Sequence, residues 1–451
     1  MKKDYLITQK PLSALTLFAL PMILGNLFQQ LYTIVDSAIV GKFVGEDALA
    51  AVGASYALTN IFICIAIGGG IGASVLVSRY FGNGNIAAMK KSAFTAFIAF
   101  FVLSVVLAIV GYFCSRVFMV ALKTPAEALD MAVEYLKIYF LGLPFLFMYN
   151  VVSSMFNALG RSTIPLVFLV CSSLANMVLD YVFVVYCGLG VAGVAWATLI
   201  AQGVSAILSF VIFFAVLKKY EGKADKVFDF AELKGMTRIA LPSVFQQSTV
   251  SIGMLLVQSV INGFGTEALA GFSAAMRIES LCVVPFAAIG NAVSAYTAQN
   301  LGAGQTQRVK KGYLAANLLV AIFSVAICLF LELGNRFLIS IFLEGEGTQV
   351  AMQTGCGYLS FMGWFFVLIG VKMAVDGLLR GAGDMLFFTI ANLVNLTIRV
   401  VMAICLAPSF GIQWVWIAVP IGWFANFLIS FVQFMRGKWK EKGKDTEEAV
   451  Q

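Results

Sequence analysis

Four polar residues in apolar segments of the first half of the chain are the best candidates for chemistry. Two are carboxylates, Asp36 and Asp180; the others are the amide Asn176 and the hydroxyl Thr198. An ionised carboxylate inside a membrane helix costs at least ~2.5 to 3.5 kcal/mol, so it is a functional candidate by default. Together these groups offer only oxygen ligands, which suit a hard cation such as Na+. The carboxylate pair could instead share a proton.

The spacing of these residues places them at one depth. Asn176 precedes Asp180 by one helical turn and shares its face. At ~1.5 Å per residue, Asp180 lies about 12 Å before the outer turn at Gly188, and Thr198 lies about 10 Å after the next apolar run begins at Val191. Asp36 lies about 8 Å before the end of its own segment by the same measure. We therefore predict a cation or proton site, with interhelical hydrogen bonding as the alternative role.

The segments that must position these residues are membrane helices. The chain has 451 residues, of which 61% are hydrophobic and 12% charged, and its mean hydropathy is +0.92. Its apolar runs are about 20 to 25 residues long, as helices that cross ~30 Å of hydrocarbon require. β-Barrel strands would be about half as long and would alternate. Twelve runs begin near Ala14, Leu49, Ser92, Met131, Thr163, Val191, Thr237, Leu269, Tyr313, Gly355, Leu386 and Ile412.

The chain reads as a tandem duplication of six-helix units. Gly82-x-Gly84 followed by Lys90-Lys91 returns as Gly302-x-Gly304 followed by Lys310-Lys311, with one common offset. Because six is even, both units insert in the same direction and are related by an axis along the membrane normal. We predict an all-α integral membrane protein, with twelve transmembrane helices as two pseudo-symmetric six-helix bundles around a central cleft.

The repeat also predicts the domain organisation. Residues 1–216 form an N-terminal lobe with helices 1–6 and the cation site, and residues 236–435 form a C-terminal lobe with helices 7–12. Residues 217–235 form a cytoplasmic linker, and residues 436–451 form a cytoplasmic tail that is both basic and acidic.

Lysine and arginine predict the orientation, because cytoplasmic loops of membrane proteins are enriched in them. Most of them fall on one side of the twelve-helix map. The loops on the other side hold only Lys42, Arg116, Lys123 and Arg336. We predict a multi-pass protein of the cell membrane (inner or plasma membrane) with both termini cytoplasmic. The net charge of +7 therefore reports topology, and we expect no nucleic-acid partner.

The second half carries a different set of charges in its apolar segments. It holds two anions, Glu279 and Asp376, and three cations, Arg277, Lys372 and Arg399. Because the positive charges outnumber the negative ones, an additional cation has little reason to bind there. We predict a charge network around the three cations, with the two carboxylates as candidate substrate contacts. Arg399 follows a Leu-x-Asn-x3 framework in which the first half has Asp180.

Other residues suggest a hinge and a cleft. Pro21 lies upstream of Asp36, where it either permits a kink that responds to the carboxylate or marks the helix start. Four glutamines in the first helices of the two lobes are candidates to line the substrate cleft: Gln29, Gln30, Gln246 and Gln247.

Enzyme chemistry and cofactors are not indicated. The chain has no histidine, its eight cysteines are scattered singly, and no nucleophile with a base or phosphate-binding Gly-rich loop is present. We expect no cofactor apart from the Na+ or H+ of the cation site, and a monomer in the lipid bilayer.

Two stretches of the sequence resemble a known family. "LPMILGNLFQQLYTIVDSAIVGKFVGEDALAAVG" and "RYFGNGNIAAMKK" resemble the multidrug and toxic compound extrusion (MATE) transporters over essentially the whole chain. In DinF-like and related members, an Asp on the first helix, Asn-x3-Asp on the fifth and Thr on the sixth form a cation site. The resemblance therefore implies the same role for the four matching residues listed here: Asp36, Asn176, Asp180 and Thr198.

The match is closer to DinF-like and MepA-like members than to NorM-like ones. NorM-like members use carboxylates on the seventh and tenth helices, but the seventh run here has none, and Asp376 has Lys372 one turn away. The resemblance implies a secondary active multidrug efflux antiporter that exports amphipathic, cationic small molecules in exchange for Na+ or H+. The alternative is a flippase for lipid-linked oligosaccharides, from the same superfamily.

Overall fold

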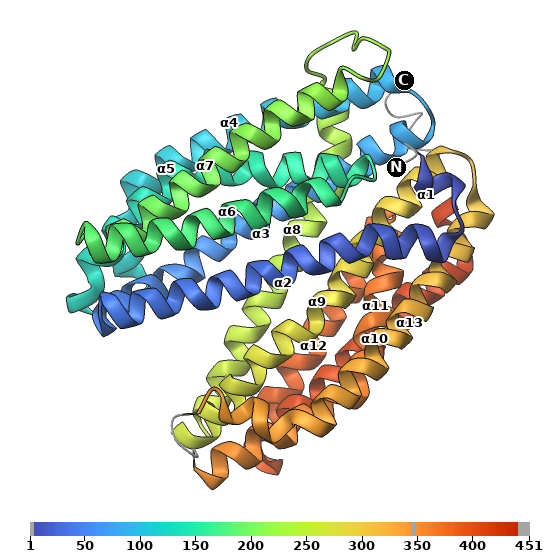
Figure 1. Cartoon of the computed structure of the whole chain (residues 1–451). Helices are drawn as coiled ribbons and strands as arrows, with labels where there is room; N and C mark the ends of the chain where they lie inside the picture. The colour runs from blue at the N-terminus through green and yellow to red at the C-terminus, as the bar shows by residue number, and fades with distance from the viewer. Residues whose placement is uncertain (1–3, 344–347, 441–451) are drawn as a thin grey trace. The chain divides into compact units, whose positions relative to one another are not determined.

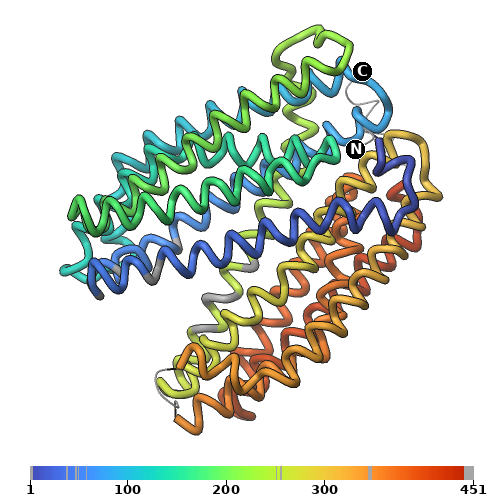
Figure 2. The backbone as a smooth tube through the Cα atoms, in the orientation of Figure 1, coloured from blue at the N-terminus to red at the C-terminus, as the bar shows by residue number. Residues whose placement is uncertain are grey.

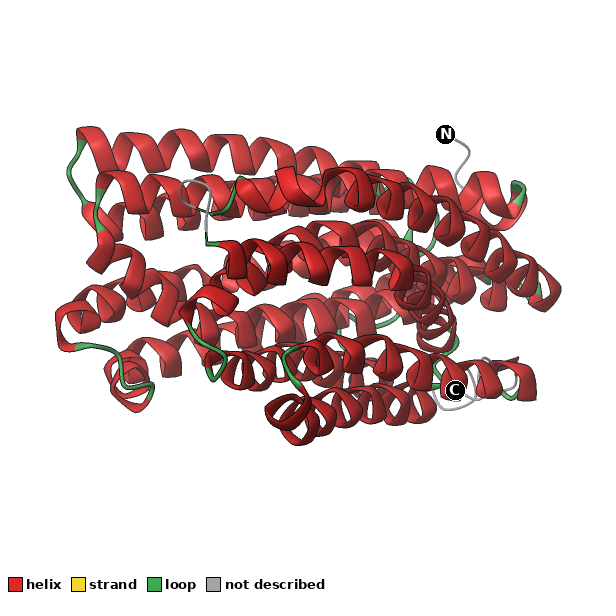
Figure 3. Cartoon of the chain, turned by 90° about the horizontal axis from the view of Figure 1, so that it is seen from below, coloured by secondary structure: helices red, strands yellow, loops and turns green. Residues whose placement is uncertain are grey.

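The computed structural model describes residues 4–343 and 348–440, and within them every regular element is a helix (Figure 3). Eleven of these helices are long and apolar enough to cross a membrane. Together with α8 they make twelve long helices, so the predicted all-α membrane fold is confirmed. In chain order the elements are α1 (Tyr5–Thr8), α2 (Pro11–Phe43), α3 (Glu46–Gly82), α4 (Ile86–Ala121), α5 (Ala126–Ala158), α6 (Thr163–Tyr181), η1 (Val182–Tyr186), α7 (Gly190–Leu217), α8 (Phe230–Asn262), α9 (Thr266–Gly302), α10 (Thr306–Ser340), α11 (Gln349–Gly381), α12 (Met385–Phe410) and α13 (Gln413–Arg436).

The chain divides into two compact units that differ from the predicted lobes. The N-unit is Leu24–Val244, and the C-unit holds residues 4–23 and 245–440 of the part described. The boundaries fall inside α2 and α8, which are labelled in Figure 1, so the first helix of each repeat begins in one unit and ends in the other. The lobes predicted from the repeat, 1–216 and 236–435, therefore have other boundaries than the compact units of the structure.

Packing at the starts of α2 and α8 explains why each begins in one unit and ends in the other. Leu15 and Phe18 on α2 are buried in the core of the C-unit together with Leu6 of α1. The start of α8 instead approaches α3 in the N-unit, where glycine permits close contact. A Cβ atom added at Gly72 would lie 2.6 Å from the Cβ of Ala240.

One helix is central in each unit. In the N-unit, α5 contacts α3, α4 and α7, and α6 packs on α7. In the C-unit, α11 contacts α9, α10 and α13, and α12 packs on α13. α5 and α11 are the fourth long helices of their repeats, so the duplication extends to the packing order.

The turns of the two repeats share backbone geometry. Gly84 and Gly304, which follow α3 and α9, have φ of +75° and +71°. Gly45 and Gly265, which precede the same helices, have φ of +116° and +96°. Glycine adopts positive φ without the strain that a side chain usually adds, so the repeated glycines suit these turns.

Two boundaries of the sequence prediction move. α8 begins at Phe230, inside the predicted linker 217–235. In the predicted tail 436–451, Trp439 is buried and its indole N–H donates to the Phe434 carbonyl at 2.9 Å, because Gly437 turns the chain back. Residues 441–451 of the predicted tail lie outside the described residues.

The contact between α9 and α11 leads to a first prediction. A Cβ atom added at Gly377 would lie 2.1 Å from the Gly290 carbonyl oxygen, and such small-residue contacts hold membrane helices together. We expect Gly377→Ala to lower stability by ~1 to 3 kcal/mol through overpacking. Thermal unfolding in detergent measures this. Gly357→Ala on the same helix is the control, since its Cβ would meet no atom of the described residues within 4 Å. Equal melting temperatures for the two variants would contradict the contact.

Candidate functional site

The candidate cation site is built around two carboxylates of the N-unit. Asp36 lies on α2 and Asp180 near the end of α6, and their carboxyl groups are within hydrogen-bonding reach of each other. The Oδ1 atom of each is buried and has no hydrogen-bond partner among the described residues. Burying charged oxygens in this way is unfavourable unless a proton or a cation neutralises them.

Asn176 joins the rest of the predicted set to this pair. With its amide oriented so that both ends are satisfied, its nitrogen donates to the Tyr32 hydroxyl and to Asp180 Oδ2, each at 3.0 Å. Its oxygen accepts from the Thr198 backbone N–H at 3.0 Å. The structure therefore brings together all four residues that the sequence predicted.

Two tyrosines complete the site and were not predicted. Tyr32 precedes Asp36 by one turn on α2, and its hydroxyl interacts with the Thr198 side chain. Tyr135 on α5 lies close enough to both carboxylates for their charges to act on it. The i, i+4 spacing could have identified Tyr32. Tyr135 has no such signal, because α5 contributes no other residue to the predicted set.

The backbone changes form next to the site. α6 ends one residue after Asp180, and Val182–Tyr186 continues as a π-helix. π-Helical segments are rare and are frequent at functional sites. This one sets the direction of the chain between Asp180 and α7.

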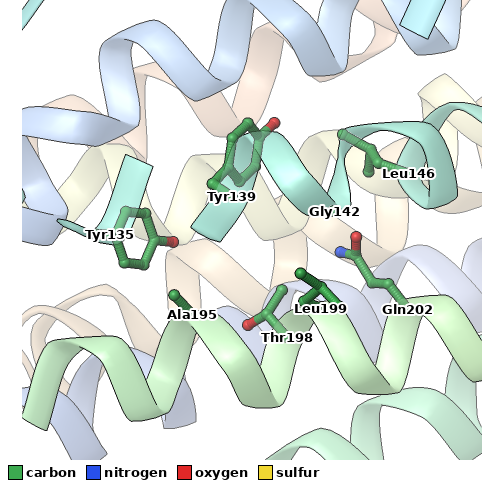
Figure 4. A pocket seen from close by; sticks show the side chains of 8 residues that line it. All are labelled: Tyr135, Tyr139, Gly142, Leu146, Ala195, Thr198, Leu199 and Gln202. Carbon is green, nitrogen blue, oxygen red and sulfur yellow. The ribbon is translucent and has the colours of Figure 1, made fainter. Parts of the chain in front are cut away.

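A small cavity adjoins the site between α5 and α7 (Figure 4). It provides ≈ 10 Å³ for a water-sized sphere, about the space of one water molecule. Tyr135 and Thr198 belong to both the cavity and the carboxylate site. Gln202, one turn after Thr198, adds an amide. The lining residues are Tyr135, Tyr139, Gly142, Leu146, Ala195, Thr198, Leu199 and Gln202.

The donor atoms suit a light cation or a proton. Carboxylate, amide and hydroxyl oxygens are ligands for hard cations, whereas transition metals favour imidazole or thiolate. The described residues contain no group of three or more His, Cys, Asp or Glu side chains that could hold a metal. A monovalent ion at the carboxylate pair is compatible with this finding.

The C-unit treats its carboxylates differently. On α11, Lys372 forms an ion pair of 3.0 Å with Asp376, and both side chains are buried. Asp376 also accepts from the Ser430 hydroxyl at 2.7 Å and from the Asn392 amide at 3.4 Å. Lys372 donates to Asn392 Oδ1 at 3.0 Å. Both oxygens of Asp376 are therefore occupied, which argues against its predicted contact with substrate.

Glu279 belongs to a second cluster. It is buried, accepts a hydrogen bond from the Tyr358 hydroxyl, and is subject to the positive charge of Arg399 without a direct ion pair. Arg277 is exposed and lies over the Phe342 ring, 5.9 Å from its centroid. The predicted network of three cations is thus divided: Lys372 and Arg399 belong to separate clusters, and Arg277 to neither.

Arg399 is also deeper than the sequence comparison with Asp180 suggests. Each helix ends before a positive-φ glycine, Gly188 or Gly411. Asp180 lies 8 residues before its glycine (188 − 180), and Arg399 lies 12 before its own (411 − 399). The difference of four residues is about one helical turn. The two charges therefore do not occupy equivalent depths.

The predicted hinge and cleft residues are placed as follows. Pro21 lies inside α2, which begins at Pro11, so it does not mark the helix start and cannot donate the usual backbone hydrogen bond. Gln29 and Gln30 belong to the N-unit, whereas Gln246 and Gln247 belong to the C-unit. A substrate cleft lined by these glutamines stays a prediction.

Comparison with known proteins places the chain in a family. The family model described as MatE matches residues 21–182 and again residues 242–405, once in each repeat. The chain belongs to this family. Members of the MATE family are transporters rather than enzymes and need no cofactor, so the function is membrane transport.

Similar proteins cover nearly the whole length of the chain. "Probable multidrug resistance protein YpnP" of Bacillus subtilis is 28% identical over 449 residues, 99% of this chain and 100% of that protein. "Probable multidrug resistance protein NorM" of Thermotoga maritima is 25% identical, over 96% of this chain and 94% of that protein. A solved MOP superfamily transporter from Pyrococcus furiosus has a TM-score of 0.91 at 25% identity, over 98% of this chain and 99% of its own. The closer kinship to DinF-like and MepA-like members stays a prediction.

Proposed function

We propose that this MATE protein is a secondary active multidrug efflux antiporter. It exports amphipathic, cationic compounds in exchange for inward Na+ or H+ by alternating access. The observation that carries this proposal is the pair Asp36 and Asp180, which lie within hydrogen-bonding reach of each other. Each has a buried carboxylate oxygen with no hydrogen-bond partner among the described residues. The printed names of two similar proteins, which describe multidrug resistance, support the substrate class.

The carboxylate pair provides the energetic coupling. When the site is empty, two neighbouring anions repel each other in a region of low dielectric constant. A cation or a proton removes that repulsion, so the occupied and empty sites favour different conformations of the helices that carry them. Asp36 and Pro21 lie on the same helix, so a change at the carboxylate is transmitted to a point where the backbone lacks a hydrogen bond.

The arrangement in the membrane follows from the lysines and arginines. Both termini and the segment between α7 and α8 lie in the cytoplasm, so the carboxylate pair faces the outer half of the membrane. The protein acts as a monomer in the cell membrane. Its coupling ion enters from outside along the electrochemical gradient.

The proposal is tested with purified protein in liposomes. Na+ and pH gradients are imposed separately, and movement of a fluorescent cationic dye is followed. Dye transport that depends on at least one gradient supports antiport. Transport driven by neither gradient would overturn it.

Thr198 distinguishes the two coupling ions. We expect Thr198→Ala to weaken Na+ dependence roughly fivefold, because a lost polar contact costs ~1 kcal/mol. The pH dependence should stay near that of the wild type, since a hydroxyl adds little to proton affinity. Ser209→Ala on the same helix is the control, because among the described residues its hydroxyl donates only to the Ala206 carbonyl, at 2.9 Å. An unchanged half-saturating Na+ concentration would remove Thr198 from the ligand set.

A further inference from the structure

The repeated basic segments at the starts of α4 and α10 have no role in the cation site. In the N-unit, the Lys90 ammonium donates to the carbonyls of Tyr220 and Gly222, each at 2.8 Å. Both carbonyls belong to the segment between α7 and α8, the long green loop in Figure 2. We call residues 218–229 the linker strap. Lys90 therefore fixes its backbone to the start of α4.

Lys91 fixes the other end of the linker strap through charge. Its ammonium lies 3.5 Å from Asp229, and 3.9 Å from both Asp225 and Glu232. Asp225 is 65% exposed and contributes little, whereas Glu232 is fully buried and depends on this cation. Glu232 also accepts from the Tyr80 hydroxyl at 3.1 Å.

Asp229 joins the linker strap to the helix that follows. Its carboxylate accepts from the Ala231 N–H at 2.8 Å at the start of α8, and its own N–H donates to the Thr95 hydroxyl on α4 at 3.1 Å. The hydrogen bond from Ala231 lowers the pKa of Asp229, and the Lys91 charge adds to this effect. The start of α8 is thus held directly against α4.

In the C-unit, the segment that leads into α2 is held in a similar way. Arg308, in the first turn of α10, donates to the carbonyls of Leu6, at 3.3 Å, and Gln9. The Asn300 amide donates to the same Leu6 carbonyl at 3.2 Å. Residues 4–10, which we call the N-terminal strap, contain α1 and lead into α2. Figure 1 shows α1 beside the end of α9, with which it is in contact.

The two basic segments correspond in sequence and in backbone, although different positions make the contacts. Lys90 and Lys91 follow the turn at Gly84, and Arg308 follows the equivalent turn at Gly304. Each basic segment holds the strap that leads into a helix divided between the units, α8 or α2. In each case the strap, the basic segment and the first part of the divided helix belong to one unit.

We propose that Lys90, Lys91 and Arg308 are positioning residues for transport. They fix the start of each divided helix to the unit in which it begins, so the bending that alternating access requires occurs further along that helix. The unit boundaries, after Ile23 and Val244, lie two residues beyond Pro21 and Pro242, where the backbone lacks a hydrogen bond. The role in transport rests on the proposed antiport, whereas the attachment of the straps does not.

Limited digestion of the full-length protein with trypsin tests the attachment. The linker strap contains four trypsin sites, Lys218, Lys219, Lys223 and Lys226. We expect Lys91→Gln to raise the cleavage rate in the strap by at least about fivefold, because cleavage follows local opening. Lys311→Gln is the matched control, since Lys311 is the sequence equivalent but is exposed and forms no ion pair with the described residues. Its cleavage rate should equal that of the wild type.

Transport by the same variants tests the positioning role. We expect Lys91→Gln to lower the maximal rate of dye efflux at least about threefold with an unchanged half-saturating dye concentration, and Lys91→Arg to restore it. Lys90→Gln, which only removes two hydrogen bonds, provides a milder second variant if Lys91→Gln does not fold. If Lys91→Gln and Lys90→Gln are both cleaved at the wild-type rate, the attachment is overturned. If they are cleaved faster but their efflux is unchanged, the positioning role is overturned. If the wild-type protein shows no gradient-driven efflux, the antiport proposal is overturned instead. The attachment of the strap is still tested in that case, because digestion does not depend on transport.

Discussion

Asp180→Asn should reduce gradient-driven dye efflux to the level of liposomes without protein, and Asp36→Asn should do the same. An amide can neither take up a proton near neutral pH nor supply the negative charge that balances a bound Na+. The two carboxylates act as one pair, so losing either one removes the difference between the occupied and empty states. The double variant should be no worse than the single variants, as expected for residues that work as a unit.

Folding has to be separated from function in this experiment. Removing one of two adjacent buried anions relieves repulsion, so we expect both variants to melt in detergent at or above the wild-type temperature. Asp130→Asn is the control: its carboxylate is 84% exposed and pairs with Arg116 at 3.2 Å. It should transport like the wild type. Wild-type efflux by Asp180→Asn would assign that residue to interhelical hydrogen bonding instead.

The helices could be predicted because the membrane constrains them strongly. A span must be long and apolar, so eleven of the twelve predicted runs begin within a long helix, and the last begins near Ile412, one residue before α13. The ends of the helices were harder to predict. The third run was expected near Ser92, but α4 begins at Ile86. The missing turn contains Lys90 and Lys91, whose charges interrupt an apolar pattern without interrupting a helix.

The candidate site divides in the same way. Asp36 and Asp180 stand out in sequence because a carboxylate is costly in an apolar helix. Tyr135 does not, since an aromatic residue in such a helix is ordinarily core or lipid-facing. The partners of Asp376 were also hidden, because Asn392 and Ser430 reach it only through the packing of α11 with α12 and α13.

The division of α2 and α8 between the units could not be read from the repeat. A duplication shows that two halves are alike, but it does not show which core the start of each half joins. That depends on contacts such as Leu6 with the C-unit core and Ala240 with Gly72, which are tertiary. The sequence therefore predicted lobes that end with the repeat, whereas the compact units end two residues beyond Pro21 and Pro242.

The ion pair of the C-unit carries the largest expected effect on stability. Lys372 and Asp376 are 3.0 Å apart, and their side chains are 6% and 5% exposed. Ser430 and Asn392 satisfy the remaining polar atoms around the pair. Its stabilising contribution therefore depends on both partners, and removing either one leaves the other charged and buried.

Lys372→Met should lower the free energy of unfolding by ~3 to 5 kcal/mol, because it leaves Asp376 as a buried anion without its counter-ion. Adding Asp376→Asn should recover most of this loss, since the second change removes the orphaned charge. Thermal unfolding in detergent of the wild type, both single variants and the double variant gives the coupling between the two sites. Lys137→Met is the control, because Lys137 is exposed above the Tyr112 ring. Additive losses in the double variant would show that the two charges do not depend on each other, and Asp376 would again be a candidate to bind a transported cation.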